Sequence, residues 1–272
     1  MIVNGDDFGY SGAINAAVIH CHREGVLTSA TILVNRPATG HALALARDNP
    51  TLGVGLHLNL TEGAPVAPAS DVASLVDRRG LFLPYPRQFW RVARGPAPLD
   101  ELEREFRAQI EFVLGRGLRP THVDGHLHVH AYPRALPLVV RLMREYGIRA
   151  MRSPLLTDWV VPYRRRDWTP NAARWWRAGR RRAWLRANGV LTTDYLLNSQ
   201  AYLVAADPSA RLLASIDALG PGTVELMAHP AWNRSETTGA AEVALLTDPR
   251  LRAGLDQRGV RCIHYGELAE ST

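Results

Sequence analysis

Adjacent carboxylates and an isolated histidine are the first residues in this 272-residue sequence with the chemistry of a metal site. Asp6 and Asp7 stand directly before Phe8, and His57 lies in the apolar stretch Gly55–Leu58. A bound cation neutralises one carboxylate of such a pair and leaves the other free to act as a base. Alternatively, one carboxylate of the pair caps the N-terminus of a helix and the other has no role. For His57 the alternative is a core histidine whose ring nitrogens are hydrogen-bonded.

A dense histidine cluster lies in the stretch Thr121–His130, which holds four of the ten histidines. Neutral imidazole is the commonest metal ligand in proteins. On an extended chain, His126, His128 and His130 would point to one side, with at most two of them as ligands. The others would support the ligands or contact the substrate, and His128 and His130 are candidate substrate contacts. We expect His122 and Asp124 to support the ligands from behind.

Two more polar residues stand where predicted strands end. Arg152 closes the apolar stretch that begins at Ile148, and His229 follows the stretch Thr223–Ala228. Pro230 fixes the backbone directly after this histidine. Either residue alone fits a structural role as well as a functional one.

Strand-like stretches alternate with helical ones along the chain, which predicts βαβ units and a parallel sheet. A helix is expected from Ser11 to about Arg23, and another from Leu99 to about Arg116. The Pro-rich stretch Asn59–Pro98 is expected to be a lid or binding loop. Seven strands are expected: Ile2–Gly5, Thr28–Val34, Gly53–Leu58, Thr121–Asp124, Ile148–Arg152, Thr223–Ala228 and Val260–His264. We therefore predict an irregular, TIM-barrel-like (β/α) barrel in a single domain, with an open doubly wound sheet as the alternative.

The candidate residues share one position relative to the predicted strands. Each follows the carboxyl end of a different strand, the face that holds the active site of (β/α) barrels; they are Asp6 with Asp7, His57, His126, Arg152 and His229. A carboxylate and two imidazoles around a divalent cation, with positions left for water, fit metal-assisted hydrolysis.

Composition excludes several other chemistries. All 32 basic residues are arginine, so Schiff-base, pyridoxal-phosphate and Walker-type phosphate-loop chemistry, which need lysine, are excluded. Cys21 and Cys262 lie far apart and form no metal motif. No apolar run reaches the roughly 20 residues of a membrane span, and the start of the chain does not resemble a signal peptide. We therefore expect a cytoplasmic enzyme.

The basic charge is concentrated in one segment. Leu155–Val190 has a net charge of +7 and five of the seven tryptophans, whereas the other 236 residues sum to −1. We interpret it as an Arg/Trp-rich insertion within a single domain of residues 1–272. Its predicted helix, Asn171–Arg186, has the composition of an interfacial helix, with Trp175 and Trp176 on one side. A solvated surface helix without membrane contact is the alternative. The partner interactions that we consider are peripheral membrane contact and a homodimer.

Four stretches together resemble the signature blocks of the YdjC-like carbohydrate deacetylases. They occur in family order and read NGDDFG, GLHLNLTEG, THVDGHLHVH and ELMAHPA, beginning at Asn4, Gly55, Thr121 and Glu225. The chain departs from the family at Leu127, where many members have histidine. The Arg/Trp-rich insertion resembles the hopanoid-associated branch, whose substrate is a membrane glycolipid.

The resemblance implies an N-deacetylase for N-acetylglucosamine units of a glycan or glycolipid. It implies one divalent metal, Mg²⁺ first, with Zn²⁺ or Mn²⁺ as alternatives, bound by Asp7, His57 and His126. It makes Asp6 the general base, His229 the general acid or oxyanion stabiliser, and Arg152 a pocket residue.

Two rival functions explain part of the pattern. A metal-dependent phosphoesterase or amidohydrolase would use the same ligands, but phosphate chemistry usually requires two metals and more carboxylates. A nucleic-acid-binding protein would use the Arg/Trp-rich insertion for stacking and phosphate contacts, and leaves the histidine cluster unexplained. We therefore expect no nucleic-acid partner.

Overall fold

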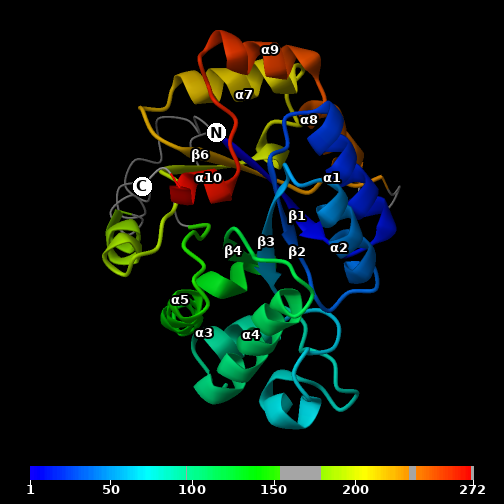
Figure 1. Cartoon of the computed structure of the whole chain (residues 1–272), viewed down its shortest axis with the longest axis vertical. Coiled ribbons are helices and arrows are strands. Elements are labelled where there is room, and N and C mark those ends of the chain that lie inside the picture. Colours follow the sequence, from blue (N-terminus) through cyan, green and yellow to red (C-terminus); the bar gives the residue numbers. More distant parts are fainter. Residues whose placement is uncertain (96, 154–178, 233–236, 271–272) are drawn as a thin grey trace.

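A six-stranded parallel sheet forms the centre of the computed structural model (Figure 1). The structure describes residues 1–95, 97–153, 179–232 and 237–270. The strands are β1 (Ile2–Phe8), β2 (Ser29–Ile32), β3 (Gly53–Leu58), β4 (Val123–Gly125), β5 (Tyr195–Asn198) and β6 (Val224–Ala228). Their order is β4-β3-β2-β1-β6-β5, and every neighbouring pair is parallel. The carboxyl ends of all six strands therefore meet at one edge.

The sheet is a half-barrel, so the prediction of a barrel with about seven strands is wrong in this respect. The predicted strand Ile148–Arg152 contributes only isolated bridges, from Met151 to Val123 and from Ala150 to Leu191. Its neighbour β4 is only three residues long because the chain turns into a 3₁₀ helix at His126. The sheet therefore ends at β4 on this side, and the stretch Ile148–Arg152 does not form a further strand.

Two other strand predictions also need correction. The stretch Val260–His264 is not a strand; Ile263 donates one backbone hydrogen bond to Met1 and packs with Ile2 and Tyr265. Strand β5 was not predicted, although Tyr195-Leu-Leu has the aromatic and apolar character of an edge strand. The other five strands lie where they were expected, within a few residues.

Helices cover the sheet on all sides (Figure 1). In this view α1 and α2 lie beside β1 and β2, α3, α4 and α5 gather near β4, and α7 and α9 lie beyond β6. The bounds are α1 Gly12–Glu24, α2 Thr39–Asp48, α3 Arg87–Ala93, α4 Leu99–Leu114, α5 Ala135–Glu145, α7 Pro208–Asp217, α8 Thr237–Leu246, α9 Pro249–Gln257 and α10 Tyr265–Glu270. Shorter 3₁₀ helices are η1 Ala69–Leu75, η2 His126–Ala131 and η3 Ser199–Ala201.

Local sequence signals explain the ends of α1. Ser11 is its N-cap, and its side chain accepts a hydrogen bond from the backbone N–H of Ile14, as its residue type predicts. At the other end the backbone N–H of Gly25 donates to the carbonyl of Cys21. The helix thereby returns the chain to β2 and leaves the β1 carboxylates at the edge of the sheet.

The histidine cluster is not extended, which corrects the prediction that alternate histidines point to one side. Residues 126–131 form η2, and Leu127 and His128 both have left-handed backbones, with φ of 49° and 57°. Non-glycine residues in this region are strained by about 1–3 kcal/mol and mark functional sites more often than chance. The turn therefore points His126, His128 and His130 in different directions.

The first half of the predicted interfacial helix, residues 171–178 with Trp175 and Trp176, lies outside the described residues. Residues 179–187 are helical, and their Arg182 pairs with Asp194 at 2.8 Å. Trp184 has 39% of its surface exposed. Within the described parts of the chain, none of the helices combines the length and apolar character needed to cross a membrane.

Candidate metal centre and active site

Asp6 and Asp7 end the central strand and point to different surroundings. Asp6 is buried, whereas the side chain of Asp7 is 17% exposed. Asp7 has a left-handed backbone with φ of 63°, a conformation that aspartate tolerates better than most residues. The bend separates two neighbouring carboxylates, so that each has its own partners.

Asp7 forms a tight cluster with His57 at the end of β3 and His126 at the start of η2. Its Oδ1 lies 3.3 Å from His57 Nε2 and 2.9 Å from His126 Nδ1. Two ligand atoms that each lie about 2.1 Å from the same ion are about 3.0–3.4 Å from each other. The two distances from Asp7 Oδ1 therefore fit a shared divalent cation. One carboxylate and two imidazoles suit Mg²⁺, Mn²⁺ or Zn²⁺. These three residues are therefore the candidate metal ligands.

Asp7 and the two histidines stabilise one another's charged forms. Burial raises the pKa of Asp7, but hydrogen bonds with both histidines hold it well below its ordinary value. Burial lowers the pKa of His57 and His126, but the surrounding carboxylates outweigh it and raise the two values to about 10 and about 9. The site therefore attracts positive charge, which a divalent cation supplies in place of two protons.

Asp124 contacts His57 on the ring nitrogen that faces away from Asp7. Its Oδ1 lies 2.6 Å from His57 Nδ1, and its Oδ2 accepts from the hydroxyl of Thr31 at 3.1 Å. A carboxylate at Nδ1 keeps a proton on that nitrogen, so Nε2, which faces Asp7, is the nitrogen that would give up its proton to bind a cation. This is the carboxylate–histidine arrangement found behind many metal ligands.

Arg152 is fully buried, which corrects its expected place in the substrate pocket. Its guanidinium contacts Asp6 at 2.6 and 2.7 Å, Asp124 at 2.8 Å and Glu225 at 2.7 Å. The sequence could not reveal that one cation holds three buried carboxylates beneath the site. The pKa of Asp6 is raised by burial and lowered more strongly by Arg152, so this carboxylate stays ionised.

Arg152→Met should destabilise the fold by about 3–5 kcal/mol, because three buried carboxylates lose their shared cation. Chemical denaturation at pH 7 measures the free energy of unfolding. Arg107→Met is the matched control, since Arg107 contacts two carboxylates, Glu103 and Glu145, at the surface. It should cost about 1 kcal/mol or less. Equal losses for the two variants would contradict the assignment.

His229 faces the other edge of Asp6. It directly follows β6, and its Nε2 lies 3.8 Å from Asp6 Oδ2. Its side chain is 33% exposed, and its backbone N–H donates to the carboxylate of Glu242. His229 is therefore accessible to solvent and lies near Asp6, at the strand end where the sequence places it.

The remaining histidines have structural surroundings. His130 is fully buried, and its Nε2 lies 3.1 Å from the carbonyl of Arg152, so it is not in the expected substrate contact. Burial lowers the pKa of His130 to about 3 and that of His128 to about 4. His122 stacks on Tyr265 with ring centroids 3.9 Å apart. It touches none of the three candidate ligands through a described hydrogen bond.

His122 should make stability depend on pH. Burial lowers its pKa to about 3, whereas an unfolded histidine has a pKa of about 6.5. Below pH 6.5 the unfolded state therefore binds a proton that the folded state excludes, and stability falls as pH falls. Between pH 6 and pH 4 this one group should cost about 2–3 kcal/mol. His122→Phe should remove that part of the slope; the packing cost is measured separately at pH 8. Parallel wild-type and variant curves would contradict the prediction.

Sequence reasoning missed Glu62, which stands in the turn after β3. Its Oε1 lies 3.4 Å from His126 Nε2. An acidic residue five positions after a rim histidine is a weak signal, and nothing in the sequence directs it toward His126. It also missed Glu225, which lies within β6 and accepts from the hydroxyl of Tyr265. Burial raises the pKa of Glu225 to about 7.

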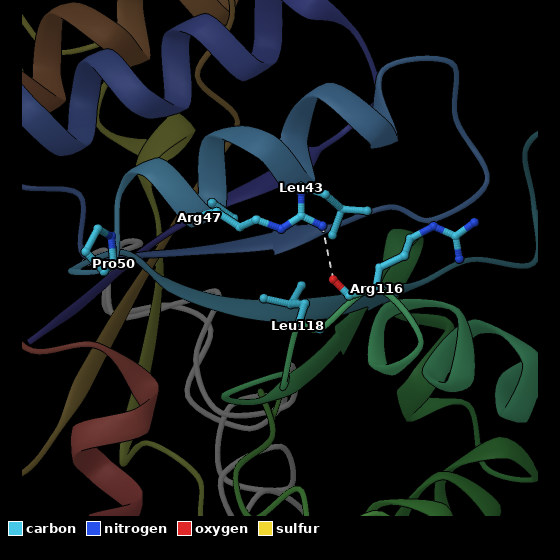
Figure 2. A pocket seen from close by; sticks show the side chains of 7 residues that line it. Leu43, Arg47, Pro50, Arg116 and Leu118 are labelled. Atoms are coloured by element: carbon cyan, nitrogen blue, oxygen red, sulfur yellow. Dashed lines mark hydrogen bonds between the residues drawn. The ribbon is translucent and has the colours of Figure 1, made fainter.

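A separate hollow lies far from these residues, between the ends of α2 and α4 (Figure 2). Arg47 donates across it to the carbonyl of Arg116 at 3.1 Å. Both helices end here and lead into the amino ends of β3 and β4. The hollow is therefore at the edge of the sheet opposite to the candidate metal ligands.

Fold and site together define an α/β protein with a candidate metal centre at the carboxyl ends of parallel strands. The sequence matches the YdjC-like protein family over residues 1–257, and the chain belongs to this family. It is 36% identical to a carbohydrate deacetylase of Geobacillus stearothermophilus, covering 98% of this chain and 97% of the other. It is 33% identical to a chitooligosaccharide deacetylase of Salmonella schwarzengrund, covering 96% of each.

A solved structure has the same overall fold. It is a putative cellobiose-phosphate cleavage protein from Enterococcus faecalis, with a TM-score of 0.76 and 28% identity. The match covers 98% of this chain and 97% of that chain. The half-barrel is therefore shared over its whole length.

Proposed function

We propose that this protein is a metal-dependent carbohydrate N-deacetylase that hydrolyses the acetamide of N-acetylglucosamine units. The observation that carries the proposal is the geometry of the strand ends. The donors of Asp7, His57 and His126 converge. Asp6 and His229 lie beside them, and Asp6 is linked to His57 through Arg152 and Asp124. The named activities of the relatives support the same reaction class.

The ligand set would hold one divalent cation, Mg²⁺ first by family, with Mn²⁺ and Zn²⁺ as alternatives. Bound there, the cation supplies Lewis-acid chemistry, polarising the acetyl carbonyl and making water easier to deprotonate. His57 and His126 must be neutral to bind it, and Asp124 keeps the proton of His57 on the nitrogen that faces away.

Asp6 and His229 divide the proton transfers. Asp6, kept ionised by Arg152, accepts the proton of the water whose oxygen bonds to the acetyl carbon. His229 then donates a proton to the nitrogen as the carbon–nitrogen bond breaks, which releases acetate and the free amine, or it steadies the oxyanion. With 3.8 Å between Asp6 Oδ2 and His229 Nε2, the two groups would face the same acetamide, Asp6 beside the attacking water and His229 beside the nitrogen or the oxyanion.

Acetate release tests the proposal directly. Metal-free protein should release no acetate from N-acetylated chitooligosaccharides, and adding one equivalent of Mg²⁺, Mn²⁺ or Zn²⁺ should restore release. Undiminished activity in excess chelator would refute the metal role. Binding of two metals per chain with phosphate release from phosphate esters would favour the rival phosphoesterase.

The form of the glycan is a second question about the same reaction. A lipid-linked sugar is the alternative to a soluble one, and the Arg/Trp composition of the insertion favours it. On that alternative the protein should sediment with anionic vesicles and be released by salt. Trp175→Ala/Trp176→Ala should then lower activity on a lipid-linked sugar and spare a soluble chitooligosaccharide. No sedimentation at low salt would leave the soluble glycan.

A further inference from the structure

We propose that Glu62 is a positioning residue that fixes the ring orientation and tautomer of His126. In this role it matches Asp124, which does the same for His57. The inference rests on the proposed function, because it concerns how one candidate metal ligand is held.

The imidazole of His126 lies between two carboxylates. Its Nδ1 lies 2.9 Å from Asp7 Oδ1, and its Nε2 lies 3.4 Å from Glu62 Oε1. A carboxylate at Nε2 keeps a proton there, so Nδ1, which faces Asp7, is the nitrogen that would give up its proton to bind a cation. His57 has the reverse arrangement, with Nδ1 toward Asp124 and Nε2 toward Asp7. Each candidate histidine ligand thus has its own supporting carboxylate.

The backbone of Glu62 is held unusually firmly for a loop residue. Its N–H donates to Asn59 Oδ1 at 3.2 Å, and its carbonyl accepts from the side-chain amides of Asn59 at 2.7 Å and Asn35 at 2.9 Å. Asn59 is itself fixed by Gln109, whose Oε1 accepts from its backbone N–H at 3.0 Å. These amides, of which Asn59 and Gln109 are buried, hold the backbone of the turn and thereby keep Glu62 beside His126.

The carboxylate of Glu62 also has a cation on its other side. Arg36 lies 3.7 Å from Glu62 Oε2, the oxygen that does not face His126. One oxygen is therefore left to accept from the imidazole while the other faces a cation.

His126 needs this support because its own backbone does not supply it. It begins η2, and the next two residues, Leu127 and His128, are both left-handed. The side chain of His126 is also 15% exposed, so the core does not hold the ring on every side. Loss of such a supporting acceptor typically costs 10–100-fold in metal affinity.

Metal affinity of three variants tests the proposal. Chelator-treated wild type, Glu62→Leu, Glu62→Gln and Arg36→Leu are titrated with Zn²⁺ and Mn²⁺ by calorimetry. Glu62→Leu should lose about 10–100-fold in affinity, since it has no acceptor. Glu62→Gln keeps an acceptor oxygen and should stay within about threefold of wild type. Arg36→Leu removes the neighbour on the far side of the carboxylate and should also stay within about threefold.

A spectroscopic signature separates positioning from a general structural effect. Long-range ¹H–¹⁵N spectra of the Zn²⁺-loaded protein should show the His126 proton on Nε2 alone in wild type and Glu62→Gln, and a second population with the proton on Nδ1 in Glu62→Leu. Wild-type affinity in Glu62→Leu would overturn the proposal, and so would equal losses in Glu62→Leu and Glu62→Gln, because charge alone would then explain them. Failure of wild type to bind any metal would instead refute the proposed function.

Discussion

Asp6→Asn is expected to bind divalent metal as wild type does and to lose turnover by about 10²–10⁴-fold, the usual contribution of a general base. The adjacent Asp7→Asn is expected to lose tight metal binding, because it removes the only anionic donor of the cluster. The structure explains why Asp7 is expected to bind the metal and Asp6 to act as the base. Asp7 Oδ1 is shared by His57 and His126, whereas Asp6 is held by Arg152.

The two variants control each other, since both replace a carboxylate by an amide of the same shape at neighbouring positions. Calorimetric titration with Mn²⁺ gives metal affinity, and kcat is measured at saturating metal. Asn at position 6 still accepts from the Asn4 side chain, which donates to Asp6 Oδ1 at 2.8 Å, and denaturation reports any cost beside Arg152. Equal loss of metal in both variants would show that Asp6 is a ligand and would end the proposed division of roles.

The candidate ligands could be predicted because strand ends are legible in a sequence. Apolar stretches of the right length mark β1 and β3, and parallel strands bring their carboxyl ends together whatever the detailed shape of the sheet. The expected neighbours Asp7, His57 and His126 therefore lie within one cluster. That result needed neither the number of strands nor the closure of the barrel, and both of these were predicted wrongly.

The supporting residues could not be predicted, because sequence pattern does not reveal which ionisable side chains turn inward. Arg152 ends a strand-like stretch exactly as an exposed pocket residue would, yet three buried carboxylates surround it. His130 looks like a ligand by spacing, and only the left-handed turn of η2 explains why it points into the core. Such facts depend on tertiary contacts between segments more than 20 residues apart.

His229→Ala is expected to lower kcat by about 10²–10³-fold while leaving KM and metal affinity unchanged, as for a group that acts only in the transition state. Its Nε2 lies 3.8 Å from Asp6 Oδ2, and it is not among the clustered donors of Asp7, His57 and His126. Steady-state kinetics with a chitooligosaccharide and titration with Mn²⁺ measure the three quantities. A raised KM with unchanged kcat would mean that His229 only holds the sugar.

The leaving group separates the two roles still open for His229. An amine must be protonated before it departs, whereas the alkoxide of an acetate ester departs more easily. If His229 donates that proton, His229→Ala should lose much less activity on an O-acetylated sugar than on the N-acetylated one. If His229 steadies the oxyanion, both substrates should lose equally, because both form the same charged oxygen. The side chain is 33% exposed at the edge of Asp6, and either role requires that access to the substrate.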